Sequence, residues 1–269
     1  MQLAIVGTGN MARAITRGLL ANHVFQAPAI TGTDNFKPSR DAFLALDPEG
    51  KLNWADSIPQ AVAKADIVLI SVKPQQIPDL FPELAQAKQN ALYISIAAGV
   101  RLERLEKGLG AGRPIIRTMP NTPLLAGEGC TAYAADSGAS EVHCQLVERI
   151  FGAAGLVFPV AEENLDAVTA LSGSGPAFFA QILDWLVQAA SAEGLPRELA
   201  YPMALQTMRG TARLLQETQM SPQELIKQVS SKGGTTEAGL GVLQGGDLAM
   251  QLGKTIRAAA RRSRELANS

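Results

Sequence analysis

The residues of this chain best suited to binding a small anion lie near its C-terminal end. The segment SKGGTT brings together Ser231, Gly233, Gly234, Thr235 and Thr236 in a region whose other residues recur at helical spacing. Each glycine costs a helix about 1 kcal/mol relative to alanine, so one helix is expected to end here and another to begin. Glycine adopts left-handed conformations, in which successive amides point into one concavity that binds anions. We predict a carboxylate site. A plain turn between helices, the alternative, needs the glycines but not the hydroxyls.

A second set of residues, at the start of the chain, is suited to binding a dinucleotide. An apolar run at residues 3–6 is followed by a helical pattern, so Gly7-x-Gly9-x-x-Ala12 lies at a strand-to-helix turn. Gly7 permits the tight turn, Gly9 lets the backbone approach a pyrophosphate, and Ala12 keeps the helix close to the sheet. Amides at the helix N-terminus then hold the phosphates. A glycine turn without a ligand is the alternative. The residues predicted to contact the cofactor here are Gly7, Thr8, Gly9, Asn10 and Met11.

The choice between NADH and NADPH depends on the residues after the second predicted strand. Asp34 stands 22 residues after Ala12, close to where an acidic residue binds the ribose of NAD. Asn35, Lys37 and Arg40 follow it, and such donors could bind the 2′-phosphate of NADP instead. Asp34, Asn35 and Lys37 are therefore predicted cofactor contacts, and the sequence leaves both cofactors open.

The elements that must position these residues are the strands of an open parallel sheet. Strands are predicted at residues 3–6, 28–33, 51–55, 65–72, 91–99 and 114–123, and the last strand signal is at residues 155–160. A ligand binds beyond the carboxyl ends of such strands, so the residues there should converge on one crevice. The further cofactor contacts predicted at these ends are Val72, Lys73, Pro74, Ala97, Ala98 and Gly99. Lys73 is either a donor near the nicotinamide or a solvated charge. Met119 and Asn121 are predicted to contact the substrate.

Beyond residue 160 the strand patterns stop and the chain reads as helices. We therefore predict two domains: an α/β Rossmann-like dinucleotide-binding domain over residues 1–160, and an all-α domain for oligomerisation and substrate binding over residues 161–269. One of the helices begins with Ser221 and carries Glu224 three residues later, the pattern of a capping box.

A strongly apolar helix in the second domain favours a partner subunit. It follows a predicted loop and opens at Pro176, and Asp184 is its only formal charge. A helix that is apolar on most sides is buried on most sides. We predict a homodimer or a higher oligomer built from dimers, with burial inside one domain as the alternative.

Composition excludes several classes of function. The net charge of −1 gives no overall attraction to nucleic acid or to anionic membranes, and no run approaches the roughly 20 apolar residues of a membrane span. The N-terminus lacks the pattern of a signal peptide, so a cytoplasmic protein is expected. Cys130 and Cys144 have no metal-ligand spacing, and no metal site is predicted.

The lack of a histidine base and of an activated cysteine limits the types of reaction that the protein could catalyse. The two histidines, His23 and His143, are isolated, and the sequence shows no activated cysteine. Hydride transfer to a ketone needs a strong acid to protonate the alkoxide, whereas a protonated imine already carries its positive charge. Catalysis of imine reduction would depend mostly on positioning. The hydroxyl of Thr236 could orient the imine nitrogen or relay a proton to it.

Six segments along the chain resemble those of pyrroline-5-carboxylate reductase. They are GTGNMARAITRGL, VKPQ, IAAGV, RTMPNTP, LSGSGPAFF and SSKGGTTEAGL, in the family's order. The resemblance implies reduction of 1-pyrroline-5-carboxylate to L-proline, the last step of proline synthesis, with NADPH or NADH. It implies that the substrate carboxylate lies against residues 231–236, with Thr236 beside the ring nitrogen. It also implies a helical domain that interlocks with that of another subunit.

Two departures from the family and two alternative functions accompany this resemblance. Many members have proline at the position of Lys232, and many have asparagine near Ile58. One alternative is another imine reductase or a hydroxyacid dehydrogenase, but the latter typically uses a lysine that the helix opening at Pro176 lacks until after Gly194. The other is a non-catalytic NADP-sensing protein, which has no need of a second anion site.

Overall fold

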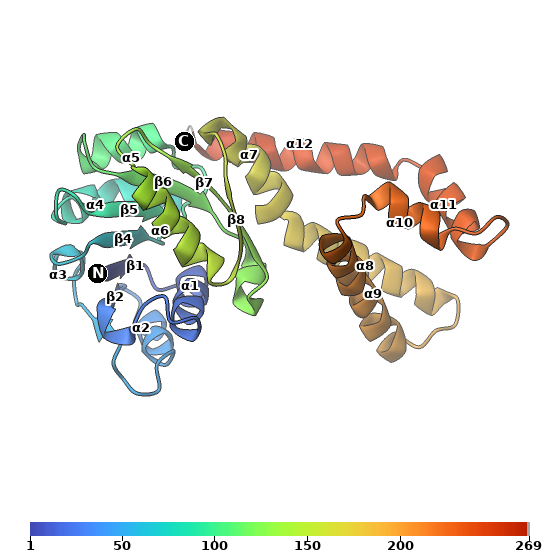
Figure 1. The fold of residues 1–269 in the computed structure, drawn as a ribbon, viewed down its shortest axis with the longest axis horizontal. Helices are drawn as coiled ribbons and strands as arrows, with labels where there is room; N and C mark the ends of the chain where they lie inside the picture. The colour runs from blue at the N-terminus through green and yellow to red at the C-terminus, as the bar shows by residue number, and fades with distance from the viewer. Residues whose placement is uncertain (268–269) are drawn as a thin grey trace. The chain divides into compact units, whose positions relative to one another are not determined.

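The N-terminal part of the chain folds around one twisted sheet (Figure 1). The computed structural model describes residues 1–267. Eight strands lie in the order β3-β2-β1-β4-β5-β6-β7-β8, and all neighbours are parallel except β6 and β7. The strands are β1 (Leu3–Val6), β2 (Ile30–Thr33), β3 (Asn53–Trp54), β4 (Ile67–Ile70), β5 (Leu92–Ser95), β6 (Ile115–Met119), β7 (Gly129–Ala135) and β8 (Gly155–Pro159).

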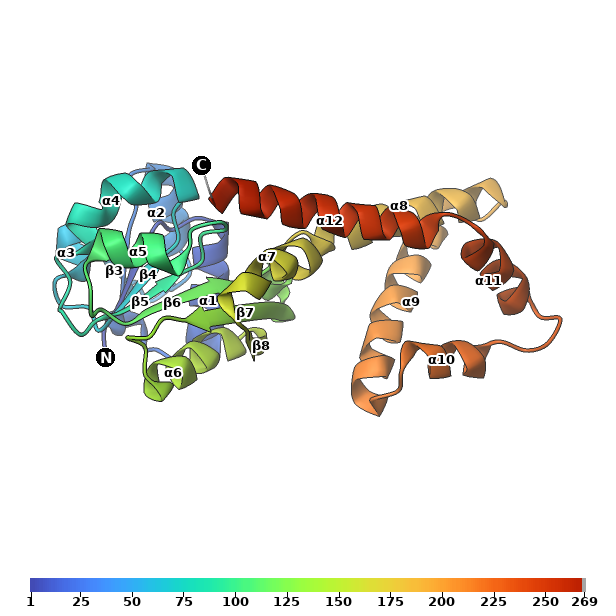
Figure 2. The same ribbon diagram turned by 90° about the horizontal axis from the view of Figure 1, so that it is seen from above.

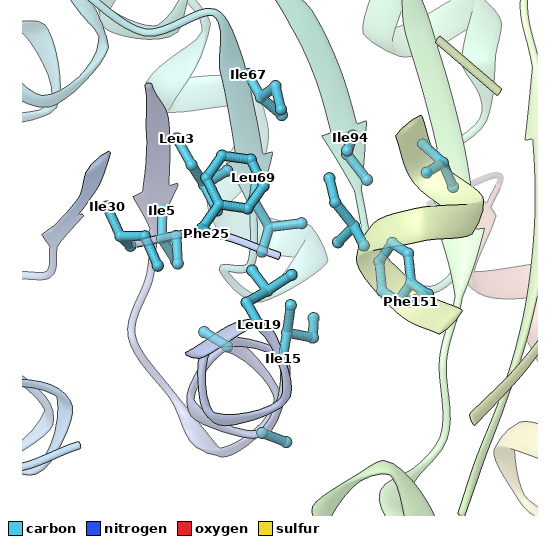
Figure 3. Close-up of a cluster of buried hydrophobic side chains, with 14 of the residues drawn as sticks. Leu3, Ile5, Ile15, Leu19, Phe25, Ile30, Ile67, Leu69, Ile94 and Phe151 are labelled. Carbon is cyan, nitrogen blue, oxygen red and sulfur yellow. The ribbon is translucent and has the colours of Figure 1, made fainter. Parts of the chain in front are cut away.

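Helices cover both faces of the sheet because the strand side chains alternate between two cores. Leu3 and Ile5 of β1 belong to a core shared with α1, α2 and α6, whereas Ala4 and Val6 belong to one shared with α3, α4 and α5. Figure 3 shows Ile15 of α1 within the first core. The helices are α1 (Asn10–Ala21), α2 (Lys37–Leu44), α3 (Ile58–Val62), α4 (Ile77–Leu84), α5 (Leu102–Leu109) and α6 (Glu141–Gly152).

The predicted strands are present, generally shorter than the apolar runs that indicated them. Residues 27–29 form a 3-10 turn before β2, for example. The sequence did not predict β7 or α6. The β7 segment GCTAYAA is composed mainly of small residues, which carry a weak strand signal. The predicted parallel sheet is confirmed except between β6 and the unpredicted β7, which run antiparallel.

The described chain divides into two compact units, which differ from the predicted domains at their boundary. One unit contains residues 1–174 together with those from Ala259 onward, and the other is Gly175–Ala258. The first extends past residue 160 because Leu165 of α7 (Leu165–Val168) is buried against Ala132 and Ala134 of β7.

The second unit consists of helices, among which α8 packs against α9 (Figure 2). The helices are α8 (Gly175–Ala192), α9 (Arg197–Thr218), α10 (Pro222–Val229), α11 (Thr235–Gly245) and α12 (Leu248–Ala267), the last of which ends in the first unit. The loop predicted before Pro176 is wrong. Thr169–Gly173 form a π-helix, in which the Ser174 amide donates to the Thr169 carbonyl at 2.8 Å. The predicted capping box of α10 is confirmed.

The end of α12 is attached to the first unit by a buried hydrogen bond. The Ser263 hydroxyl donates to an Asp166 carboxylate oxygen at 2.6 Å, and both residues are buried. Leu266 lies against Gly99, where a Cβ added to the glycine would be 3.3 Å from the leucine side chain. No helix within residues 1–267 has both the length and the apolar character needed to cross a membrane.

Candidate active site

The β1–α1 turn has the geometry needed to hold a pyrophosphate. Gly7 has φ +89°, and a Cβ there would lie 2.6 Å from the Ser71 carbonyl oxygen, so only glycine fits. The Gly7 amide donates to the Thr33 carbonyl at 2.9 Å. Gly9 is the N-cap of α1, and a Cβ there would meet no atom within 4 Å. No side chain caps α1, so its first amides and positive end are available for an anion.

A cleft of about 350 Å³ opens beside this turn, at the carboxyl ends of β1, β2 and β4. Six of the predicted cofactor contacts line it: Gly7, Gly9, Asp34, Asn35, Val72 and Lys73. Seven lining residues were not predicted as contacts: Val6, Thr33, Phe36, Ile58, Ser71, Gln76 and Leu80. Ser71 could have been predicted from the sequence, because it stands at the strand end immediately before Val72.

The other predicted cofactor contacts do not line this cleft. Pro74 and Ala98 line a separate cavity of about 220 Å³ together with Leu266. Ala97 is buried, and Gly99 lies under the last turn of α12. Thr8 is fully buried. The remaining predicted contacts, Asn10, Met11 and Lys37, belong to the first turns of α1 and α2.

Asp34 acts as a strut for the glycine turn. One carboxylate oxygen accepts hydrogen bonds from the Thr8 amide at 2.8 Å and from the Thr8 hydroxyl at 3.3 Å. The other oxygen accepts from the Phe36 amide at 2.9 Å. Three donors of the protein therefore occupy the carboxylate that the sequence suggested for ribose binding.

Asn35 and Arg40, the hydrogen-bond donors that follow Asp34, differ in whether the protein already engages their side chains. Asn35 lines the cleft. The Arg40 guanidinium lies 5.3 Å from the centre of the Trp54 ring and 3.7 Å from an Asp56 carboxylate oxygen. A guanidinium stacked in this way is already oriented by the protein, so Asn35 is the better placed of these two to meet a cofactor.

Met119 and Asn121 stand at the carboxyl end of β6, as predicted, but both are in contact with the protein. The Asn121 amide group donates to the Ser172 carbonyl at 3.1 Å and accepts from the Cys130 amide at 2.9 Å. Met119 packs on Gly173, where an added Cβ would clash with its methyl group. Their contact with substrate stays a prediction.

The Ser231–Thr236 segment has the form of an open anion site at the N-terminus of α11. Gly233 has φ +71° and Gly234 is extended, so only the first glycine adopts the predicted left-handed conformation. The Gly234 amide donates to the Ser231 carbonyl at 3.0 Å. Within residues 1–267, the amides and hydroxyls of Thr235 and Thr236 have no hydrogen-bond partner, which leaves them free for a ligand.

Neither cysteine thiol is activated. Burial raises the pKa of the Cys130 thiol and of the Cys144 thiol, which lowers the thiolate fraction of both at neutral pH. In the part of the chain that the structure describes, no group of three or more His, Cys, Asp or Glu residues could hold a metal ion.

Comparison with known proteins identifies the family. A family model described as pyrroline-5-carboxylate reductase dimerisation matches residues 162–266, and one described as NADP oxidoreductase, coenzyme F420-dependent, matches residues 2–99. A protein of Arabidopsis thaliana named pyrroline-5-carboxylate reductase is 37% identical over 270 residues, which cover 100% of this chain and 96% of that protein. This chain belongs to the pyrroline-5-carboxylate reductase family.

Solved structures of the pyrroline-5-carboxylate reductase family share the whole fold. The reductase of Coxiella burnetii superposes with a TM-score of 0.93 at 36% identity and covers 100% of this chain and 99% of its own. The Plasmodium falciparum enzyme, solved with NADP bound, has a TM-score of 0.85 at 26% identity, with coverage of 99% and 98%. The family resemblance read from six short segments is therefore confirmed over the full length.

Proposed function

We propose that this chain catalyses the reduction of 1-pyrroline-5-carboxylate to L-proline with NADPH. The observation that carries the proposal is the full-length match to reductases of this name at 37% identity. The geometry supports it, because the chain holds a dinucleotide turn at Gly7 and Gly9 and an open cluster of amides and hydroxyls at Thr235 and Thr236. These two sites suit the two anionic molecules of the reaction.

The residues of the chain act mainly by positioning. The Gly9 amide and the first amides of α1 hold the pyrophosphate, and the absence of any atom within 4 Å of a Gly9 Cβ fits this role. A bound NADPH would supply the hydride that reduces the imine carbon. The amides of Thr235 and Thr236 hold the substrate carboxylate. The Thr236 hydroxyl orients the ring nitrogen, which keeps the proton of the protonated imine and becomes the amine of proline.

We propose NADPH rather than NADH as the preferred cofactor. Asp34 would favour NADH by accepting a hydrogen bond from the ribose 2′-hydroxyl with its carboxylate. Here the Thr8 and Phe36 amides and the Thr8 hydroxyl occupy it. Asn35 in the cleft and Lys37 in the first turn of α2 supply donors for the phosphate.

We propose that residues 161–269 form the oligomerisation domain and that the protein is at least a homodimer. The family model named for dimerisation matches residues 162–266. The compact unit Gly175–Ala258 leaves large apolar side chains exposed, among them Trp185 at 56% and Val242 at 80%. Large apolar side chains left exposed in one unit favour burial against another subunit.

We also propose a cytoplasmic location. Cys130 and Cys144 are free thiols, and reducing compartments maintain cysteine in that state. Fractionation of cells that produce the native protein tests this, and recovery of the protein in a secreted fraction would contradict it.

The decisive experiment measures the absorbance loss of NADPH, and separately of NADH, in the presence of 1-pyrroline-5-carboxylate. We expect rapid oxidation with L-proline formed in equal amount, and a higher kcat/KM with NADPH. A reaction without protein is the control. Tight dinucleotide binding without turnover would overturn the proposed reaction, and a higher kcat/KM with NADH would overturn the proposed preference.

A further inference from the structure

Two consecutive helices of the second unit begin with an acidic side chain that reaches back to a backbone amide. In α10, the Glu224 carboxylate accepts from the amide of the N-cap Ser221 at 2.7 Å and from its hydroxyl at 2.8 Å. The Ser221 hydroxyl accepts from the Glu224 amide at 3.3 Å. This is a complete capping box.

The reach-back contact of α11 departs from that pattern. Its N-cap is Gly234, which has no side chain and whose amide donates to the Ser231 carbonyl. Glu237, three residues after the N-cap, accepts from the amide of Gly233 at 2.6 Å, one residue before the N-cap. The carboxylate therefore holds the single left-handed residue of the loop, at φ +71°.

The Ser231–Thr236 loop is therefore held by hydrogen bonds that leave the amides of Thr235 and Thr236 unused. The Gly233 amide is bonded to Glu237 and the Gly234 amide to Ser231, whereas the next two amides, of Thr235 and Thr236, have no acceptor within residues 1–267. A left-handed glycine has many alternative conformations, so a contact that fixes it also fixes the direction of the amides that follow.

We propose that Glu237 is a positioning residue for the substrate, which preorganises the Ser231–Thr236 segment by holding the Gly233 amide. The inference rests on the proposed function, because it assigns the amides of Thr235 and Thr236 to the substrate carboxylate. Glu237 does not contact substrate. It lowers the cost of ordering the loop when the carboxylate binds, and such preorganisation is expressed as affinity.

Glu237 would instead weaken substrate binding if repulsion between its carboxylate and the substrate carboxylate dominated. A negative side chain within one helical turn of an anion site weakens anion binding. Removing it would then tighten the binding of the imine. The direction of the change in KM separates the two effects.

The test compares Glu237→Ala, Glu237→Gln and Glu224→Ala in the full-length protein. The substitution of Glu224 is a matched control, because it removes a reach-back contact of the neighbouring helix. For Glu237→Ala we expect KM for 1-pyrroline-5-carboxylate to rise about fivefold, equivalent to about 1 kcal/mol for one lost hydrogen bond, with kcat changed less than KM. The product-inhibition constant of L-proline should rise by the same factor, since both molecules carry the carboxylate.

The controls separate positioning from general stability. The glutamine of Glu237→Gln retains an acceptor oxygen, so its KM should stay within about twofold of the unaltered value, since a neutral acceptor still bonds an amide. Glu224→Ala should lower the melting temperature and leave both constants unchanged.

Several outcomes would overturn the proposal. An unchanged or lower KM in Glu237→Ala would do so, and so would an equal rise in Glu224→Ala. A rise in Glu237→Gln as large as that in Glu237→Ala would show that charge, not the hydrogen bond, matters. Absence of turnover in the unaltered protein would overturn the proposed function and this inference together, whereas normal turnover with an unaffected Glu237→Ala would overturn this inference alone.

Discussion

Gly7 and Gly9 lie two residues apart in the β1–α1 turn, yet the protein itself excludes a side chain at only one of the two positions. Gly7 is held by the fold, because its φ of +89° and its distance to the Ser71 carbonyl exclude a side chain. Gly9 has an extended conformation that any residue adopts, with φ −67° and ψ −172°, and open space beside it. The surrounding protein does not require glycine at this position, as expected if a ligand approaches the backbone there.

Gly9→Val should therefore abolish dinucleotide binding and leave the fold intact. The valine side chain would fill the space of the pyrophosphate. Fluorescence titration with NADPH measures the binding, and thermal unfolding measures the fold. Gly7→Ala is the comparison, and it should lower stability as well as binding. Retained affinity in Gly9→Val would contradict the assignment of the turn.

Asp34→Ala should weaken the binding of NADPH and NADH by similar factors. The carboxylate supports the turn through Thr8 and Phe36, so its loss should disturb the pyrophosphate site that both cofactors share. Dissociation constants for the two cofactors provide the measurement. A loss confined to NADH would show instead that Asp34 binds the ribose.

Thr236→Ala should lower kcat for the imine by roughly tenfold, or about 1.4 kcal/mol of transition-state stabilisation, with little change in NADPH affinity. The hydroxyl has no partner among the described residues, so its removal leaves no protein group unsatisfied. Thr236→Ser, which keeps the hydroxyl, should retain most of the activity. Full turnover by the alanine variant would exclude the hydroxyl from the mechanism.

At the scale of elements, buried polar side chains fasten helices to the sheet. Arg113, 8% exposed, donates to the carbonyls of Ala85, Ala87 and Lys88, which follow α4, and to the Tyr93 hydroxyl at 3.0 Å. The Tyr93 hydroxyl in turn donates to the Leu84 carbonyl at 2.7 Å. One guanidinium thus holds the segment that follows α4 against Tyr93 of β5.

Arg113→Met should lower the free energy of unfolding by about 3 kcal/mol, because it removes the hydrogen bonds of a buried guanidinium and leaves the buried Ala87 carbonyl and the partly buried Ala85 carbonyl without a donor. Urea unfolding measures the change. Lys88→Ala is the control. It removes the exposed ion pair with Asp66 at 2.7 Å and should cost about 1 kcal/mol or less. Equal losses in the two variants would refute the role assigned to Arg113.

At the scale of the whole molecule, we expect the exposed apolar side chains of Gly175–Ala258 to be buried against another subunit. Light scattering at micromolar concentration should give a mass at least twice that of the 28.3 kDa chain. Trp185→Glu, on α8, should lower the mass or the concentration at which the oligomer persists. Val142→Glu, at an exposed apolar position on α6 in the other unit, should leave the mass unchanged. A monomer of the unaltered protein would refute the interlocking helical domain.

Short sequence patterns were enough to predict several turns, caps and strands of this protein. The β1–α1 turn, the Ser221–Glu224 capping box and the break at Gly233 were readable from sequence, because each depends on residues within a few positions of one another. The apolar run of β4 was readable as well, because a strand buried on both faces is apolar throughout.

The tertiary structure alone decided what those residues contact. Asp34 is a strut because Thr8, 26 positions earlier, donates to it, and Gly99 is covered because Leu266 folds back over it. The end of α12 belongs with the sheet rather than with the other helices because Ser263 meets Asp166, 97 positions away. Such contacts leave no periodicity in the chain, since they arise from close packing of distant segments, and so they become visible only when the segments are brought together.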